Sequence, residues 1–271
     1  MGLDDGRYLT RSDGEASEVV VVATLGAPAV ERSRRSRRRR AAAVPDDPGA
    51  AGLPLTRLTV ITPSELGDAA AAASWLDSVA RDADATGMQV GAAMRLVNRA
   101  LAAQRAGAQD PYVHELAAEH AVALRIGYGT GDEVADGKWS DAREIPAPEG
   151  RRRRTETLAP QEHVAAVLGG RDELLVSETL VLRARLDLDQ GRAREAALQL
   201  RVGLEALLRE LTGATSPGVR EDVATLAANR DAIVEAANEA LRGELDEAHV
   251  AAVRDALARC ERALRRRRFG S

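Results

Sequence analysis

The chain has 271 residues, of which 45 % are hydrophobic and only 2 % aromatic, and its formal net charge is −4 at pH 7. The length favours two domains, and the scarcity of aromatic rings argues against a surface that stacks nucleic-acid bases. The single cysteine, Cys260, excludes an intramolecular disulfide and is typical of a reducing compartment.

No apolar run reaches the roughly 18 residues of a membrane helix, because the nearest one, over residues 19–30, is interrupted by Gly26 and Pro28. A signal peptide places its basic residues before the apolar stretch, whereas Arg32–Arg40 follow it. We therefore expect a cytoplasmic protein with no membrane partner.

The amino-terminal part predicts an α+β domain over residues 17–150, preceded by a disordered leader over residues 1–16. Four consecutive valines within Glu18–Thr24 are typical of a strand buried on both faces. A second strand is expected over Leu55–Thr62. Between the two strands, an Arg-rich loop is expected over residues 31–54, because its like charges repel one another. The expected sheet is small and mixed.

Two helices are predicted after the second strand. Thr62–Glu65 has the sequence of a helix start, with threonine at the cap, proline in the first turn and glutamate placed to close a capping box. The apolar stripe of this first helix includes Leu76. The second helix has a stripe that includes Val97 and Leu101, and Gly107 is expected to end it.

From Glu119 the apolar pattern changes to a period of two, which predicts a half-buried strand through Ile126 and Tyr128, and residues 138–145 predict its partner. The glycine-rich segment Gly127–Gly137 between them follows a strand, as a dinucleotide loop would. It lacks the glycine spacing of that fingerprint, and it carries acids where an anion would bind. We expect a flexible turn here.

The histidines and acids do not form a recognisable metal or cofactor motif. His114 and His120 are six residues apart, whereas a zinc protease needs two histidines four apart on one helical face. Asp187 and Asp189 resemble the start of a calcium loop, but the third acidic ligand and the closing glutamate are missing. The sequence therefore predicts no metal and no cofactor.

Residues 151–271 predict an all-α domain of helical hairpins, with the domain boundary within Pro146–Thr157. At its centre is Glu173–Leu211, two antiparallel helices joined at Gly191, which can take the left-handed conformation that ends a helix. The second of these helices has an apolar seam, and the first has a stripe of leucines on one face. The seam consists of Ala196, Leu200, Leu204, Leu207 and Leu211, and the stripe of Leu175, Leu182 and Leu186.

Three further helices are expected in this domain. A short one covers Pro160–Leu168 and is closed by Gly169 and Gly170. Another begins at Ser216 and ends at Gly243. The last begins at Asp246 and continues into a basic tail at Arg265–Arg268.

The central hairpin resembles one tetratricopeptide-type unit. Ala196, Leu200 and Gly203 fall where the second helix of that repeat has small, large and small residues. Asp187 stands where the family prefers an aromatic residue, and the following ~34 residues do not repeat the pattern. The resemblance covers about one eighth of the chain and implies a helix-hairpin interaction module as a type.

Arginines concentrate in three segments, Arg32–Arg40, Arg151–Arg154 and Arg265–Arg268. With these fifteen set aside from the 38 basic residues, 23 remain against 42 acidic ones, so the rest of the chain is acidic. The segments are either polyanion contacts, for a nucleic-acid backbone or an acidic protein surface, or solvated linkers rich in arginine. The candidate contact residues are Arg34, Arg35, Arg37, Arg38, Arg39, Arg40, Arg151, Arg152, Arg153, Arg154, Arg265, Arg266, Arg267 and Arg268.

Three functional hypotheses follow. The first is a non-enzymatic protein-interaction or scaffold module built on helical hairpins, with another protein as its partner. The alternative is a protein that binds nucleic acid without regard to sequence through the arginine segments. An enzyme with its site at Gly127–Gly137 is the third.

Overall fold

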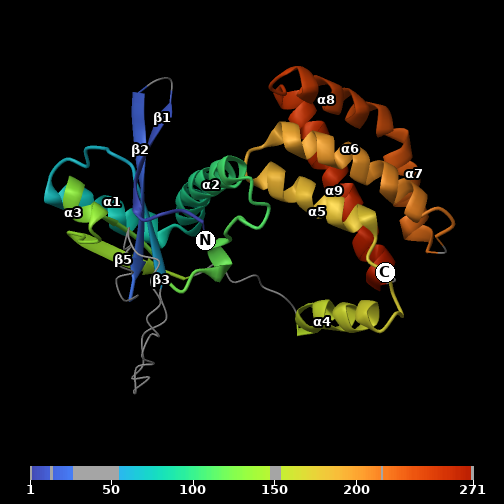
Figure 1. The fold of residues 1–271 in the computed structure, drawn as a ribbon, viewed down its shortest axis with the longest axis horizontal. Coiled ribbons are helices and arrows are strands. Elements are labelled where there is room, and N and C mark those ends of the chain that lie inside the picture. The colour runs from blue at the N-terminus through green and yellow to red at the C-terminus, as the bar shows by residue number, and fades with distance from the viewer. Residues whose placement is uncertain (1, 13–14, 27–54, 147–153, 215, 270–271) are drawn as a thin grey trace, which may run out of the picture. The chain divides into compact units, whose positions relative to one another are not determined.

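The strands of the amino-terminal part form two small antiparallel sheets (Figure 1). The first has the order β1–β2–β3, with β1 at Gly6–Ser12, β2 at Glu15–Leu25 and β3 at Leu55–Ile61. The computed structural model describes residues 2–12, 15–26, 55–146, 154–214 and 216–269. The predicted Arg-rich loop at 31–54 lies outside the described residues. The first sheet is antiparallel rather than mixed, because both pairs of neighbouring strands run in opposite directions.

Three of the four valines of β2 have the environment that the sequence predicts. β2 is the central strand, and consecutive residues Val20, Val21 and Val22 are all buried. Because neighbouring side chains on a strand point to opposite faces, both faces of the sheet are covered at this point.

The prediction of a disordered leader over residues 1–16 is wrong for β1. This strand pairs along β2, with Arg7 opposite Val21 and Leu9 opposite Val19. Asp5 strengthens the edge by accepting hydrogen bonds from the backbone N–H and the hydroxyl of Thr24. Backbone pairing holds a polar sequence at a sheet edge, where the strand needs no apolar face of its own.

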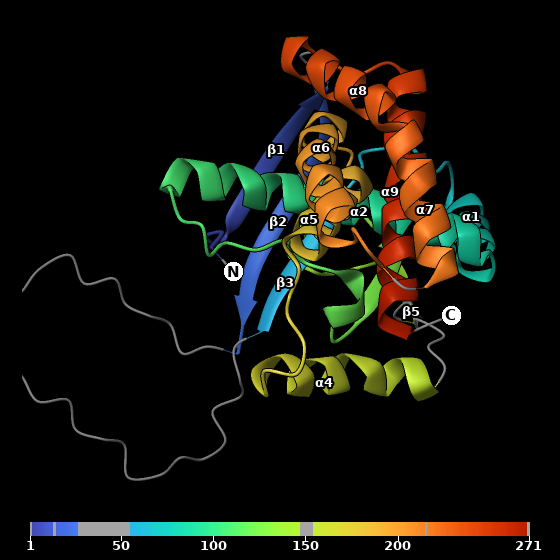
Figure 2. The ribbon, with the colours of Figure 1, turned by 90° about the vertical axis from the view of Figure 1, so that its right-hand side faces the viewer.

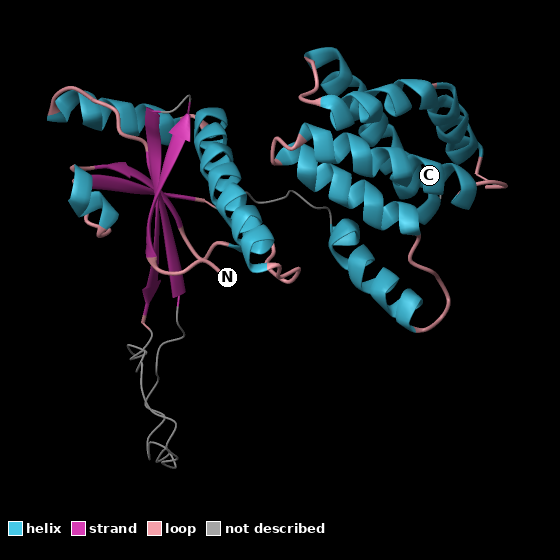
Figure 3. Cartoon of the chain, turned by 45° about the horizontal axis from the view of Figure 1, so that its top comes forward, coloured by secondary structure: helices cyan, strands magenta, loops and turns pink. Residues whose placement is uncertain are grey.

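Two helices follow the sheet, α1 at Ala69–Arg81 and α2 at Ala83–Ala108. The predicted helix start at Thr62–Glu65 is wrong, since α1 begins after Asp68, whose carboxylate accepts a hydrogen bond from the Ala71 N–H at 2.8 Å. Asp82 caps α2 in the same way. In Figure 3, α2 runs alongside the strands. Its Val97 and Leu101 pack in one core cluster with Val20 and Val22.

The second sheet pairs β4, at Leu124–Tyr128, with β5, at Asp141–Ile145. The two strands and their antiparallel pairing agree with the predicted pair, although Val122 precedes the strand and is exposed. A 3₁₀ turn at Ala118–His120 leads into β4. A short helix, α3, occupies Gly131–Ala135 between the strands.

The chain divides into two compact units, residues 1–149 and 150–271, and the regular elements in the described residues of the second are all helices (Figures 1 and 2). The whole is therefore an α+β protein with a helical carboxy-terminal region. Within the described residues of the second unit the helices are α4 (Arg154–Leu168), α5 (Val176–Asp189), α6 (Ala193–Glu210), α7 (Pro217–Ala228), α8 (Arg230–Arg242) and α9 (Glu247–Phe269). The described helices contain no segment with the length and apolarity that crossing a bilayer requires.

The predicted hairpin is present as α5 and α6, and its α6 seam forms the centre of the helical core. Leu200, Leu204 and Leu207 are almost completely buried, and they share a cluster with residues of α5, α7, α8 and α9. Gly203 allows α5 to approach closely, because a Cβ at this position would lie 3.1 Å from the Cβ of Leu180. The joint at Gly191 has the expected positive φ of 76°.

Three helix boundaries differ from the sequence-based expectations. The helix expected from Ser216 to Gly243 is two helices, because the chain breaks at Asn229, whose side-chain amide donates to the Thr225 carbonyl and competes with the helical pattern. The expected basic tail is helical, since α9 continues to Phe269. Finally, α4 begins at Arg154 and contains Pro160 in its interior.

Candidate functional site

The glycine-rich segment between β4 and β5 contains α3 rather than a flexible turn alone. Its glycines lie where the backbone comes close to other groups. A Cβ on Gly127 would lie 2.5 Å from the Asp141 carbonyl oxygen, and one on Gly129 would lie 2.7 Å from a methyl group of Val134. Gly137 has a φ of +84°, a conformation that favours glycine. Close packing and turn geometry therefore account for these glycines.

The acids of this segment are engaged in ion pairs within the first unit. Arg7 of β1 donates to Asp132 at 2.5 Å and to Asp136 at 3.2 Å. The hydrogen bond that Arg7 donates to Asp132 is the main reason why the pKa of Arg7 is raised. These contacts attach α3 to the edge of the three-stranded sheet, so they give both acids a structural role.

The candidate metal ligands of the sequence are not brought together. Across the described ranges, no group of three or more His, Cys, Asp or Glu side chains is placed to hold a metal ion. Asp187, which resembles the first ligand of a calcium loop, instead forms an ion pair with Arg192 at 2.7 Å. This pair closes the turn between α5 and α6.

The arginines at the end of α9 bind carboxylates of their own unit. Arg266 donates to Asp222 of α7 at 2.9 Å and to the Gly218 carbonyl. Arg267 pairs with Asp172 at 3.2 Å, and Arg268 pairs with Glu178 of α5 at 2.9 Å. These three side chains hold the last turns of α9 against neighbouring elements, so a phosphate would have to compete with an existing carboxylate partner.

The remaining predicted arginine contacts fall in other settings. Arg34, Arg35, Arg37–Arg40 and Arg151–Arg153 lie outside the described residues, and so does the side chain of Arg154. Arg265 is exposed. Within the described residues it has no carboxylate partner, in contrast to Arg266, Arg267 and Arg268.

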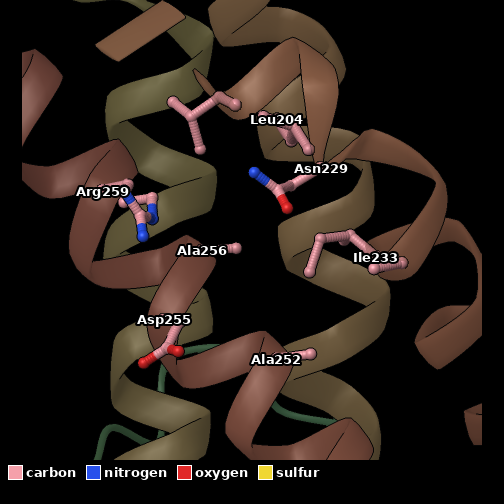
Figure 4. Close-up of a pocket in the computed structure, with 9 residues that line it drawn as sticks. Leu204, Asn229, Ile233, Ala252, Asp255, Ala256 and Arg259 are labelled. Atoms are coloured by element: carbon pink, nitrogen blue, oxygen red, sulfur yellow. The ribbon is translucent and has the colours of Figure 1, made fainter.

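A cleft of about 220 Å³ lies between α6, α7, α8 and α9 (Figure 4). Leu204, Leu226 and Ile233 are among its apolar lining residues, and Asp255 and Arg259 are its charged ones. The three apolar residues are at most 2 % exposed, so a ligand would find little apolar surface left to cover. The volume is also below the roughly 300–1,000 Å³ of common ligand pockets. The cleft is consequently a poor small-molecule site.

A further candidate site is the outer side of α5. Leu182 is 66 % exposed and Leu186 38 % exposed, although the sequence pattern predicts both in a buried stripe. The buried side of α5 consists instead of Ser177, Glu178, Val181 and Ala184. The prediction that Leu182 and Leu186 are buried is wrong, because α5 has apolar residues on two sides and periodicity does not distinguish them. Since α6 approaches α5 closely at Gly203, the side of α5 with the smaller residues is the one that packs against the core.

Arginines flank these two leucines. Arg183 is exposed and lies three residues before Leu186, which makes them neighbours on the helix surface. On α9, Glu261 pairs with Arg185 and Arg268 pairs with Glu178. Helical periodicity then places Arg265 on the side of α9 that borders α5, at the level of Leu182. We call the group Leu182, Arg183, Leu186 and Arg265 the α5 outer face.

The sequence contains one signal for this surface. From Leu174 to Leu188 the apolar residues are too numerous for a single stripe, which indicates that one side of the helix lacks a place in the core. Periodicity does not say which side. No pattern in the sequence predicts that Arg265 lies beside the leucines of α5, because its position depends on how α9 packs against α5.

Cys260 is buried in the core of the helical unit, and burial raises its pKa to about 12. The reactive thiolate form is therefore scarce near neutral pH. We expect a thiol-specific chromogenic reagent to leave the native protein unmodified for hours and to modify one thiol per chain after denaturation. Rapid modification of the native protein would show that α9 separates readily from the core.

Comparison of the chain with protein-family models, with curated proteins and with solved structures finds no match.

Proposed function

We propose that the carboxy-terminal unit is a non-enzymatic protein-interaction module, and that its α5 outer face binds an amphipathic, acidic helix of a partner protein. The proposal depends mainly on one observation: Leu182 and Leu186 are exposed side by side, with arginines on both flanks.

The apolar part of the face suits a helical partner. Leu182 and Leu186 are four residues apart, so they lie one above the other on the same side of α5. Partner helices commonly bind such surfaces through apolar residues repeated at three and four positions. The neighbouring helix α9 supplies a second wall, because it is fixed to α5 by the Arg185–Glu261 pair at 2.7 Å.

The charges indicate an acidic partner. Within the described part of the chain, Arg183 and Arg265 have no carboxylate partner, in contrast to Arg185, Arg267 and Arg268. A partner helix that carries glutamates beside its apolar stripe would pair with both arginines. Such surface pairs contribute about 0.2–1 kcal/mol each.

The size of the face implies a transient complex. The exposed parts of the two leucines together amount to about one leucine side chain, worth roughly 1.5–3 kcal/mol when covered. Association itself costs about 4–15 kcal/mol in lost freedom of motion. Contacts of the partner with residues around the two leucines must supply the remaining binding free energy. We therefore expect a dissociation constant in the micromolar range or weaker.

Nucleic-acid binding is the alternative, and the ion pairs of α9 weaken it. Three of the four arginines at this end of the chain already have carboxylate partners. The arginine segments outside the described residues remain available to this hypothesis. A nuclease-sensitive complex would therefore favour the alternative.

The test is site-specific photocrosslinking in cells. A benzophenone amino acid at position 182 should capture a protein partner, whereas the same residue at position 241 should not. Leu241 of α8 is a matched control, because it is 65 % exposed but lies on a different helix. Capture at position 182 should disappear when Leu186 is replaced by aspartate.

The captured peptide decides the outcome. The proposal requires an acidic amphipathic helix whose affinity, measured by fluorescence anisotropy, falls roughly 2- to 30-fold in the double variant Arg183→Glu and Arg265→Glu. Equal capture at positions 182 and 241, or a peptide without acidic residues, would contradict it. Nuclease-sensitive capture would point to nucleic acid instead.

We also propose a cytoplasmic location for this module. The support is the single unpaired cysteine, buried in the helical core, which is compatible with a reducing compartment.

A further inference from the structure

We propose that the segment after α2, residues 109–117, is a second interaction surface of the chain, and that it binds an arginine-rich segment of a partner protein through Tyr112 and Asp110. We call this segment the Tyr112 loop. It belongs to the amino-terminal unit, so the inference goes beyond the function proposed for the α5 outer face. Three observations carry it: an exposed aromatic ring at a surface hollow, a backbone held in place by side chains, and a local excess of acids.

The Tyr112 loop presents an aromatic ring at a hollow in the surface. Tyr112 is 81 % exposed, in a chain in which only 2 % of the residues are aromatic. The loop and Gly2 line a hollow of about 480 Å³, which lies within the roughly 300–1,000 Å³ of common binding pockets. Tyrosine often dominates binding at protein interfaces, because a large side chain with few rotatable bonds loses little freedom when it is covered. A partner side chain can therefore be covered by this ring at a low entropic cost.

Side chains of α2 hold the backbone of the loop in place. The buried amide of Asn98 donates to the carbonyl of Leu116 at 2.9 Å and accepts from its N–H at 2.8 Å. Arg105 donates to the carboxylate of Glu115 at 2.6 Å and to the carbonyl of Val113 at 3.3 Å. Val113 itself packs in the core cluster of the sheet and α2. The loop has no regular secondary structure, yet its conformation is fixed before a partner arrives, which lowers the cost of binding.

The charge around the loop indicates a basic partner. No lysine or arginine occurs in residues 106–124, although the chain contains 38 of them. The same residues include Asp110, Glu115 and Glu119. Glu115 is paired with Arg105 at 2.6 Å, whereas in the described part of the chain Asp110 and Glu119 have no basic partner. The surface is therefore locally acidic and would repel the phosphates of a nucleic acid.

Tyr112 and Asp110 together suit a guanidinium group. One carboxylate oxygen of Asp110 accepts from the backbone N–H of Tyr112 at 2.9 Å, which fixes the acid next to the tyrosine and leaves the second oxygen able to accept from a partner. An arginine can stack on an aromatic ring and also donate to a carboxylate, because its guanidinium is planar and carries several N–H groups. Each of the two contacts is worth a few-fold in affinity at an exposed site, so binding is weak for a single arginine and needs several of them.

The test is fluorescence anisotropy with the full chain and a fluorescein-labelled peptide of alternating arginine and glycine. The salt concentration is about 0.15 M, at which exposed charges more than roughly 8 Å apart are largely screened. Tyr112→Ala should lower the affinity about 2- to 5-fold, and Tyr112→Phe, which keeps the ring, should retain it. Asp110→Asn should lower the affinity by a similar factor, since asparagine can still accept from the Tyr112 N–H but has no charge.

Two controls separate this site from general attraction to an acidic protein. Asp255→Asn changes the net charge as Asp110→Asn does, at an exposed position of the other unit, and should leave the affinity unchanged. A peptide in which citrulline replaces arginine is neutral and similar in shape, and should not bind.

Four results would overturn the proposal. They are no measurable binding of the arginine peptide, equal affinity of Tyr112→Ala and the unsubstituted chain, equal losses for Asp255→Asn and Asp110→Asn, and undiminished binding of the citrulline peptide. Because Tyr112 is exposed, its replacement should leave the protein folded, and matching circular dichroism checks this. None of these variants alters the α5 outer face, so the outcome is independent of the photocrosslinking experiment.

Discussion

Replacement of Leu200 by alanine should lower the free energy of unfolding of the helical unit by about 2–5 kcal/mol. Leu200 lies in the middle of α6 and is completely buried. Its neighbours in the core come from α5, α8 and α9, so relaxation of one helix cannot fill the space that the side chain leaves. We therefore expect a large cavity term in addition to the lost transfer free energy.

Urea unfolding followed by far-ultraviolet circular dichroism measures this loss. Val202→Ala is the matched control, since Val202 lies on the outer side of the same helix, and it should change the stability by less than about 0.5 kcal/mol. Trp75 and Trp139 both lie in the first unit, so tryptophan fluorescence follows that unit separately. An unchanged fluorescence transition is expected for Leu200→Ala. A loss in stability below about 0.5 kcal/mol would show that this side of α6 is not part of the core.

Replacement of Glu178 by alanine should cost about 3–5 kcal/mol, because it removes one partner of a buried ion pair. The Glu178 carboxylate is 5 % exposed and accepts from Arg268 at 2.9 Å, with Arg267 at 3.8 Å. Its other oxygen accepts from the backbone N–H of Leu175 and so caps α5. The two guanidinium groups are 27 % and 35 % exposed and can regain some water, so we expect a value near the lower end.

The two roles of Glu178 can be separated by a second variant. Glu178→Gln keeps an oxygen that can accept from Leu175 but removes the charge, so its loss of stability should fall between those of Glu178→Ala and the unsubstituted protein. Thermal unfolding of both variants, followed by circular dichroism, provides the comparison. Equal stability of Glu178→Ala and the unsubstituted protein would refute the view that the arginines of α9 serve mainly to hold α9 on α5.

The elements that the sequence predicts correctly are those in which local pattern and tertiary environment agree. The valines of β2 occur in sequence without polar interruption, and only the centre of a sheet buries both faces of a strand. The α6 seam has one apolar side, so its orientation toward the core was determined by periodicity alone. Gly191 ends α5 because few other residues adopt its positive φ without strain.

The candidate site was not predictable in the same way. In α5, Leu182 and Leu186 are larger and more apolar than Val181 and Ala184, yet the two smaller residues face the core. The distance between α5 and α6 decides this, and that distance is set by Gly203 on the other helix. The sequence shows an excess of apolar residues on α5, and only the packing shows which of them remain exposed.

The arginines of α9 illustrate the same limit for charge. In the sequence, Arg265–Arg268 form one basic cluster with a single expected role. In the structure, three of them bind Asp222, Asp172 and Glu178, which lie 44 or more residues away in the chain. The types of most elements follow from the amino-acid pattern, because hydrogen bonding and side-chain periodicity within an element are local. Which leucines stay exposed and which arginines stay without a carboxylate depends on the fold, because burial and ion pairing involve residues that are distant in sequence.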